Sequence, residues 1–251
     1  KILMKFLLFI FLLLQFPGGL NSKEELNIDA AIEKTTTYLL KNWRSDNKLK
    51  QWQAPQVIPV KKGSKIYGGC TYSEYSIDVA GSYYCPSTHT IILVPSQLKS
   101  FRKIFGNSSI AYIISHEYAH AIQLALKFNL PNPYSELQAD CLAGYLINKG
   151  NIELGITREN ILEMASAAYS IGGKTHGTGA QRSYALLSGM GTVDSDCSAE
   201  SITKLGNDEI YDPFYKRITR ERSDGSGLDI NSSTYRKDAF ELLGISKERK
   251  I

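Results

Sequence analysis

The spacing of hydrophobic and polar residues predicts a chain of helices with a few short strands. Apolar side chains recur every three or four residues over 27–43 and again over 110–126, which is the spacing of one buried helix face. Residues 107–109, Asn-Ser-Ser, can cap the second of these helices. Between the two helices, runs rich in β-branched and aliphatic residues at 56–60 and 90–94 predict a small sheet.

The first of these predicted strands contains Pro59. Because proline has no N–H to donate to a neighbouring strand, we expect an edge strand at 56–60. An edge strand can hold an extended peptide by pairing with it, or it can simply end the sheet, and the pattern leaves both interpretations open.

The second half of the chain is predicted to be mostly helical. After a Pro-Asn-Pro break, a helix is expected over about 134–147, and Thr157 stands where the next helix needs an N-cap. Thr178 and Gln181 have the spacing of a capping box, so a further helix should begin there and end near Gly189.

The N-terminal segment has a different pattern. Residues 6–14 are uninterrupted apolar residues, preceded by Lys1 and Lys5 and followed by a Pro-Gly-Gly turn. The run is shorter than the roughly 20 residues of a membrane span, so it predicts a signal peptide over 1–22 and an exported protein, periplasmic or extracellular. No Ala-x-Ala-like cleavage site is present near 20–22, so an N-terminal membrane anchor is the alternative.

Composition places few further limits on the chain. With 251 residues, of which 43% are hydrophobic, it can bury the core of one large domain. The net charge of +4 is small and the basic residues are interleaved with acidic ones, so no nucleic-acid partner is expected.

The chain contains four cysteines, Cys70, Cys85, Cys141 and Cys197. An even number in an exported chain favours two disulfides, and the lack of a C-x-x-C pair argues against a four-cysteine zinc site. Of the three possible pairings, proximity in the sequence favours Cys70–Cys85 together with Cys141–Cys197.

The sequence His-Glu-Tyr-Ala-His at 116–120 lies on the helix predicted over 110–126. Four residues apart on a helix, His116 and His120 lie on one face and can bind one zinc ion, and Glu117 is placed to take a proton from zinc-bound water. The alternative is that both histidines are buried structural residues, each satisfied by one hydrogen bond.

Two acidic residues follow on the next predicted helix. Glu136 and Asp140 are also four residues apart, so they share one face. Glu136 can complete the site as a third ligand, leaving the fourth position open as a catalytic zinc requires. Asp140, one turn away, can then accept the free ring N–H of a ligating histidine. The alternative is a pair of solvated surface acids.

Four sequence blocks occur together in this chain. They are Tyr83-Tyr84-Cys85-Pro86, His116-Glu117-Tyr118-Ala119-His120, Glu136-Leu137-Gln138-Ala139-Asp140-Cys141 and His176-Gly177-Thr178-Gly179-Ala180-Gln181-Arg182. Their order and content resemble the bacterial putative neutral zinc metallopeptidase family over about Cys70 to Cys197. An HExxH motif alone is shared by many zinc hydrolases, whereas the last two blocks are far more selective.

The resemblance implies a set of functional residues. It assigns His116, His120 and Glu136 as zinc ligands and Glu117 as the catalytic base. The chain departs from the family pattern at Thr88, where the family commonly has an acidic residue, and residues after about 199 lie outside that pattern.

The predicted fold is α-rich α+β, of the zincin kind. We expect a small sheet from residues near 55–95 packed on the HExxH helix, then a helical second half, with the active site in the cleft between them. The predicted domain spans 23–199, and 200–251 is a C-terminal extension to which no role is assigned.

A further catalytic role is predicted for His176. Attack by water puts negative charge on the carbonyl oxygen, and a side-chain donor beside the metal can share that charge. His176 precedes a predicted helix N-terminus, which also favours an anion, and Arg182 is the other donor in the block. The alternative is that His176 only hydrogen-bonds the backbone of its glycine-rich turn.

These residues together predict a zinc peptidase that hydrolyses peptide bonds of a peptide or protein substrate, with Glu117 as general base. Two alternatives stay open. The chain can be a zinc hydrolase of a non-peptide amide, such as a cell-wall bond, or an envelope protein that binds zinc without catalysis. Retention of Glu117, which a structural zinc site does not require, argues against the second alternative.

Overall fold

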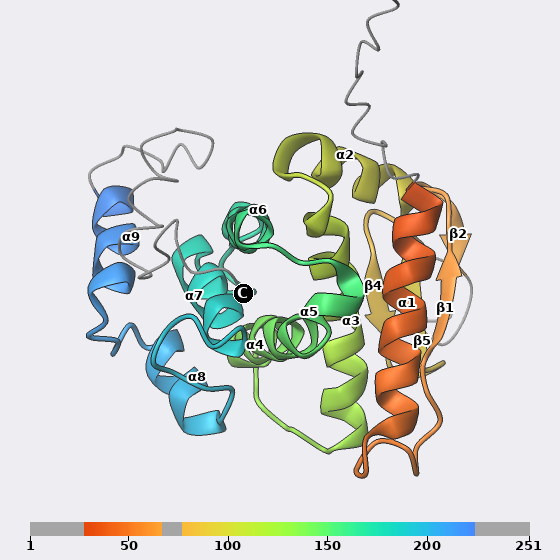
Figure 1. Ribbon diagram of the computed structural model, residues 1–251, viewed down its shortest axis with the longest axis horizontal. Coiled ribbons are helices and arrows are strands. Elements are labelled where there is room, and N and C mark those ends of the chain that lie inside the picture. Colours follow the sequence, from red (N-terminus) through yellow and green to blue (C-terminus); the bar gives the residue numbers. More distant parts are fainter. Residues whose placement is uncertain (1–27, 67–76, 224–251) are drawn as a thin grey trace, which may run out of the picture.

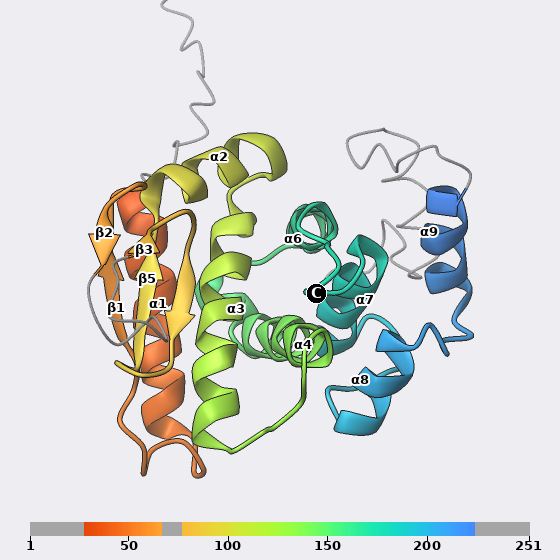
Figure 2. The same ribbon diagram turned by 180° about the vertical axis from the view of Figure 1, so that it is seen from behind.

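The computed structural model describes residues 28–66 and 77–223 of the chain. Helix α3 (Ser108–Ala125) runs through the middle, with the strands and α1 on one side and a group of helices on the other (Figures 1 and 2). The other helices are α1 (Ile28–Ser45), α2 (Pro95–Phe105), α4 (Tyr134–Lys149), α5 (Asn151–Leu154), α6 (Arg158–Ser170), α7 (Gly179–Gly189), α8 (Ala199–Gly206) and α9 (Pro213–Ser223). The predicted α-rich α+β fold is confirmed.

The larger sheet has three strands. Its central strand β5 (Thr90–Leu93) pairs in parallel with β1 (Gln56–Pro59) and antiparallel with β4 (Tyr83–Cys85). The prediction of an edge strand around Pro59 is therefore confirmed, and β4 forms the opposite edge. A separate antiparallel pair consists of β2 (Lys65–Ile66) and β3 (Ile77–Asp78).

Strand β5 is buried on both faces of the sheet. Because side chains alternate along a strand, Ile91 and Leu93 join the main core with α1 and α3, whereas Ile92 packs on the other face with Val79 and Val94. The sheet is therefore held against α3, and β4 lies beside that helix (Figure 2).

The N-terminus of α3 is capped differently from the prediction. The Asn107 side chain makes no capping hydrogen bond. Instead Glu163 of α6 accepts hydrogen bonds from the Ser108 hydroxyl at 2.6 Å and from the Ser108 backbone N–H at 3.4 Å. A carboxylate is favoured at a helix N-terminus, so α6 supplies the cap from outside the segment.

The two helices predicted from capping residues are present. α6 begins after Thr157 and α7 begins after Thr178, and each N-cap forms a capping box with the residue three positions later. Helix α7 ends at Gly189, as expected.

Helices α4 and α7 touch through glycines. A Cβ atom on Gly144 would lie 2.2 Å from the carbonyl oxygen of Leu186, and one on Gly189 would lie 1.8 Å from that of Cys141. No side chain fits at these distances, so the two backbones approach more closely than any other residue would allow.

Residues that follow 199 continue the packing of the second half. Helices α8 and α9 bury Ile202, Leu205, Phe214 and Ile218 against Leu137 and its neighbours. Part of the predicted C-terminal extension is thus built into the core of the domain. The segment predicted as a signal peptide or anchor (1–22) lies outside the described residues, and no described helix is both long and apolar enough to span a bilayer.

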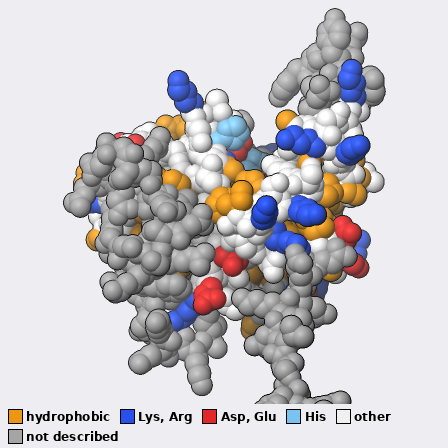
Figure 3. Space-filling model, turned by 90° about the horizontal axis from the view of Figure 1, so that it is seen from above, with side chains coloured by type: hydrophobic (Ala, Val, Ile, Leu, Met, Phe, Trp, Pro, Cys, Tyr) orange, Lys and Arg blue, Asp and Glu red, His pale blue; other side chains and the backbone are white. Residues whose placement is uncertain are grey.

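Lysine and arginine side chains gather on one half of the face seen from above (Figure 3). This half carries α2 and the turn between β1 and β2, and α1 begins at the same end of the molecule (Figure 1). Exposed lysines of α2 and of the turn between β1 and β2 include Lys61, Lys62, Lys99 and Lys103. The small net charge is therefore unevenly distributed.

Candidate metal centre

Two helices supply the residues of the candidate site. His116, Glu117 and His120 lie on α3, and Glu136 and Asp140 lie on the first turns of α4. Asp140 is fully buried and Glu136 is only 9% exposed, so the alternative of two solvated surface acids is excluded. The packing of α4 against α3 brings all five side chains together.

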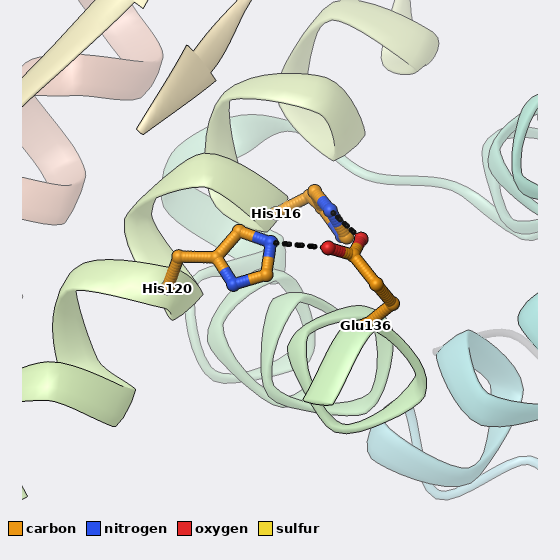
Figure 4. A group of neighbouring side chains, drawn as sticks. All are labelled: His116, His120 and Glu136. Carbon is orange, nitrogen blue, oxygen red and sulfur yellow. Dashed lines mark ion pairs between the residues drawn. The ribbon is translucent and has the colours of Figure 1, made fainter. Parts of the chain in front are cut away.

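Three of these side chains converge on one point (Figure 4). The Nε2 atom of His116 lies 3.3 Å from one oxygen of Glu136, and the Nε2 atom of His120 lies 3.5 Å from the other oxygen. One ligand atom from each residue falls within 4.8 Å of the others. The group therefore has the size and the chemistry to hold one metal ion.

The orientation of the His116 ring is set by Asp140. The Nδ1 atom lies 2.8 Å from Oδ1 of Asp140, and since a carboxylate accepts, Nδ1 carries the hydrogen. The lone pair of Nε2 therefore points to the position where the three side chains converge. This is the orienting role that the sequence analysis expected of Asp140. Burial alone would lower the pKa of His116, but Asp140 and Glu136 raise it to about 10, so a metal ion must displace a proton there.

The His120 ring is oriented by a neighbour that the sequence analysis missed. Its Nδ1 atom lies 2.8 Å from Oε1 of Gln123. The amide nitrogen of Gln123 donates to the carbonyl oxygen of Ser135 at 2.8 Å and to Gln138 at 3.1 Å, which leaves its oxygen to accept from His120. Both histidines therefore donate from Nδ1 and present Nε2 to the same point.

We predict that Gln123→Leu weakens zinc binding by about 10–100-fold, the usual effect of removing a hydrogen-bond partner of a ligating histidine. Competition with a fluorescent zinc chelator measures the affinity. Gln123→Glu keeps an oxygen acceptor for Nδ1 but loses the donor to Ser135 and Gln138, and it should retain more of the affinity than Gln123→Leu. Equal losses in the two variants would show that the acceptor for His120 is not what supports zinc binding.

Arg182 is tied to Asp140 and not free to act as a separate donor. Its Nε and Nη2 atoms donate to the two oxygens of Asp140 at 2.8 and 3.0 Å, and the Tyr112 hydroxyl donates to the same carboxylate at 2.7 Å. Burial alone would raise the pKa of Asp140, but the charges of Arg182 and His116 lower it overall. Asp140 therefore stays ionised and keeps its hold on His116.

The side chain of Glu117 extends from α3 towards the edge strand β4. Its carboxylate accepts a hydrogen bond from the backbone N–H of Tyr84. Burial raises the pKa of Glu117, although the charges of His116 and His120 oppose this shift. The Tyr84 hydroxyl in turn donates to Nδ1 of His89 at 2.6 Å, because the other ring nitrogen of His89 faces the carbonyl oxygen of Gln53. Glu117 is thus an acid–base group fixed beside the convergent ligands.

Glu117 and the three convergent side chains line a cleft of about 740 Å³. Its walls are β4 on one side and the start of α4 on the other, whereas β1, the edge strand that the sequence singled out, does not line it. His176 also lines the cleft, but its side chain is exposed and its Nδ1 lies 2.8 Å from the Thr175 hydroxyl. The structure therefore brings His176 to the same cavity without tying it to the metal ligands.

The predicted disulfide between Cys141 and Cys197 is present, with the Cα atoms 5.5 Å apart. It connects α4 to the segment before α8, where the amide nitrogen of Gln138 donates to the carbonyl oxygen of Cys197 at 3.2 Å. Cys70, the predicted partner of Cys85, lies outside the described residues, so that pairing stays a prediction.

Removal of the Cys141–Cys197 bridge should loosen both the fold and the site. For its sequence separation of 56 residues, loop-closure entropy predicts a loss of about 4 kcal/mol in the free energy of unfolding. We expect this loss in urea unfolding of the Cys141→Ser/Cys197→Ser variant, together with weaker zinc binding through the Gln138–Gln123–His120 contacts. Unchanged zinc affinity would show that the disulfide does not support the metal site.

Helix spacing could have identified two of the missed residues. Tyr112 stands four positions before His116 and Gln123 stands three positions after His120, so both extend the face of α3 that carries the histidines. The contact between Tyr84 and Glu117 has no such signal, because it joins residues on different elements.

The donor set fits zinc. Two imidazole nitrogens, each oriented by a hydrogen-bonding neighbour, and one carboxylate match the three-ligand set of a catalytic zinc site. A helix bearing His-Glu-x-x-His, with an acidic side chain from the next helix beside it, is the arrangement typical of zinc-dependent hydrolases.

The chain belongs to the putative neutral zinc metallopeptidase family, whose profile matches residues 21–198. This match begins nearer the N-terminus than the four sequence blocks and includes α1 and the sheet. Searches of curated proteins and of solved structures gave no match.

Proposed function

We propose that the protein is a zinc-dependent peptidase that hydrolyses peptide bonds with Glu117 as general base. The observation that carries this proposal is the convergence of His116, His120 and Glu136 beside the buried carboxylate of Glu117. A purely structural metal site needs no such fourth group, and protein ligands usually fill all four of its coordination positions.

Zinc bound by these three residues supplies a Lewis acid and lowers the pKa of a bound water towards 7. The residues of the chain do the rest. His116 and His120 keep their Nε2 atoms in place through Asp140 and Gln123. Glu117 accepts the proton of the attacking water on its carboxylate and delivers it to the nitrogen of the leaving amine.

The substrate backbone is proposed to lie along β4. Among the described strands β4 pairs only with β5, and the Tyr84 N–H hydrogen-bonds the Glu117 carboxylate. An extended peptide added to the other edge of β4 would run through the cleft past Glu117.

The deciding experiment incubates the purified protein with a peptide library and, separately, with peptidoglycan, each with and without a zinc chelator. Cleavage of peptides that stops with chelator and returns with zinc supports the proposal. Release of cell-wall fragments alone would make the chain a hydrolase of non-peptide amides. Zinc binding without cleavage of either substrate would make it a binding protein.

We propose that His176 donates a hydrogen bond to the carbonyl oxygen of the substrate as charge develops on it. His176→Ala should then lower kcat by about 10²–10³-fold with zinc content and melting temperature nearly unchanged. Lys174→Ala, an exposed change in the same loop, is the control. A variant that melts early but keeps its kcat when folded would make His176 structural.

We also propose that the protein is exported and stays at the membrane surface through its N-terminal apolar segment. The segment at 6–14 precedes α1, and α1 begins at the same end of the molecule as the exposed lysines of α2 and the β1–β2 turn. Lysines near an anionic lipid surface strengthen a weak apolar anchor. Fractionation of cells that express the full chain tests this proposal.

A further inference from the structure

A second pocket lies on the opposite side of the HExxH helix. It has a volume of about 640 Å³ and is formed by the second half of α1, the segment after it and β1. It shares no lining residue with the cleft that holds the metal ligands. Tyr118, the residue after Glu117, points to this side of α3 and lines the pocket.

The Tyr118 side chain is only 2% exposed, and its hydroxyl makes no hydrogen bond with any residue of the described ranges. The hydroxyl borders the pocket, so a bound molecule can accept a hydrogen bond from it.

The pocket is positively charged. Arg44 and Lys50 line it, and no aspartate or glutamate does. Neither cation forms an ion pair with a described carboxylate, and the Lys50 amino group only donates to the Asn47 side chain at 2.8 Å. A cluster of two cations and one free hydroxyl favours an anionic ligand with several acceptor oxygens.

Three aromatic side chains, Trp43, Trp52 and Tyr118, line the pocket. Trp43 is almost fully buried and its ring meets that of Tyr118 edge-on at 5.7 Å, whereas Trp52 is 44% exposed. The backbone of Trp52 is held in place because the Trp43 indole N–H donates to its carbonyl oxygen at 3.0 Å. An exposed indole on this backbone, beside two cations, provides a surface for an apolar or aromatic group.

We propose that this pocket binds an organic carboxylate that carries an aromatic or branched apolar group. The carboxylate is held by Arg44, Lys50 and the Tyr118 hydroxyl, and the apolar group packs on Trp52. Such a ligand is either a free aromatic acid or the C-terminal residue of a peptide. The site does not depend on the metal centre or on the proposed peptidase activity.

The chain is well suited to a direct test, because its two tryptophans are Trp43 and Trp52 and both line the pocket. Titration with 3-phenylpropionate should give a saturable change in tryptophan fluorescence. The uncharged 3-phenylpropanamide, of nearly the same shape, should bind about tenfold or more weakly. Absence of a saturable change, or equal binding of acid and amide, would overturn the proposal.

Variants locate the binding. Arg44→Gln and Tyr118→Phe should each weaken binding of 3-phenylpropionate, Arg44→Gln by about tenfold, whereas the control Lys48→Gln, on the same segment but outside the pocket, should not. Arg44 is exposed, so its variant tests the site even if Tyr118→Phe disturbs the core. Equal affinities for Arg44→Gln and Lys48→Gln would refute the assignment of the site.

The same assay distinguishes the two sources of the carboxylate. Acetyl-Gly-Gly-Phe with a free C-terminus is compared with its C-terminal amide and with 3-phenylpropionate. Tighter binding of the free peptide than of the small acid identifies a peptide C-terminus as the ligand. Tighter binding of the small acid identifies a free aromatic acid, and both results support a carboxylate site.

Discussion

Replacement of Glu117 by glutamine should abolish peptide hydrolysis while the protein keeps about one equivalent of zinc. The change preserves the shape of the side chain and the three ligands, but an amide cannot take up the proton of the attacking water. Loss of a general base typically costs 10²–10⁴-fold in rate, which would leave little measurable activity. Zinc content by elemental analysis and initial rates on one cleaved peptide are measured on the same sample.

The structure also predicts what Glu117→Gln does to stability. Glu117 is buried and its pKa is raised by that burial, so a neutral side chain at this position should not destabilise the fold. A variant that loses its zinc would show that Glu117 is itself a ligand. A variant that keeps its full rate would remove Glu117 from the mechanism.

Removal of the carboxylate of Glu136 should have the largest effect on metal binding. Glu136 faces both Nε2 atoms, so Glu136→Ala leaves only two ligands and should not retain zinc through dialysis. Asp140→Asn keeps all three ligands but disturbs the orientation of His116 and its pairing with Arg182. We expect it to lower zinc affinity or activity by about 10–100-fold.

These two variants test the assignment of the acids against each other. Glu159→Ala, an exposed carboxylate on α6, is the control and should bind zinc like the unmodified chain. If Asp140→Ala releases zinc and Glu136→Ala does not, the roles of ligand and orienting residue are reversed.

Much of this architecture could be predicted from local sequence patterns. The spacing of apolar residues located α1 and α3, and the capping residues Thr157 and Thr178 located the starts of α6 and α7. These features depend on residues within one turn of each other, so they are recorded locally in the sequence. The pairing of Cys141 with Cys197 also followed from simple proximity.

The features that sequence reasoning missed depend on contacts between distant elements. Glu163 caps α3 from α6, and Arg182 reaches Asp140 across 42 positions of the chain. The choice between β1 and β4 as the strand beside the cleft likewise follows from the order of the strands, which neither segment encodes alone. Such contacts become visible only when the packing of the elements is known.

The glycine contact between α4 and α7 has a consequence for how the chain tolerates mutation. Gly144 lies one turn after Asp140, and Gly189 lies two turns after Arg182, on the two helices that this ion pair joins. A methyl group at either glycine would meet a backbone carbonyl that cannot rotate away, so the helices would move apart and stretch the contacts to Asp140. A genetic screen for lost zinc affinity should therefore recover the substitutions Gly144→Ala and Gly189→Ala, although neither glycine has a side chain that could bind zinc.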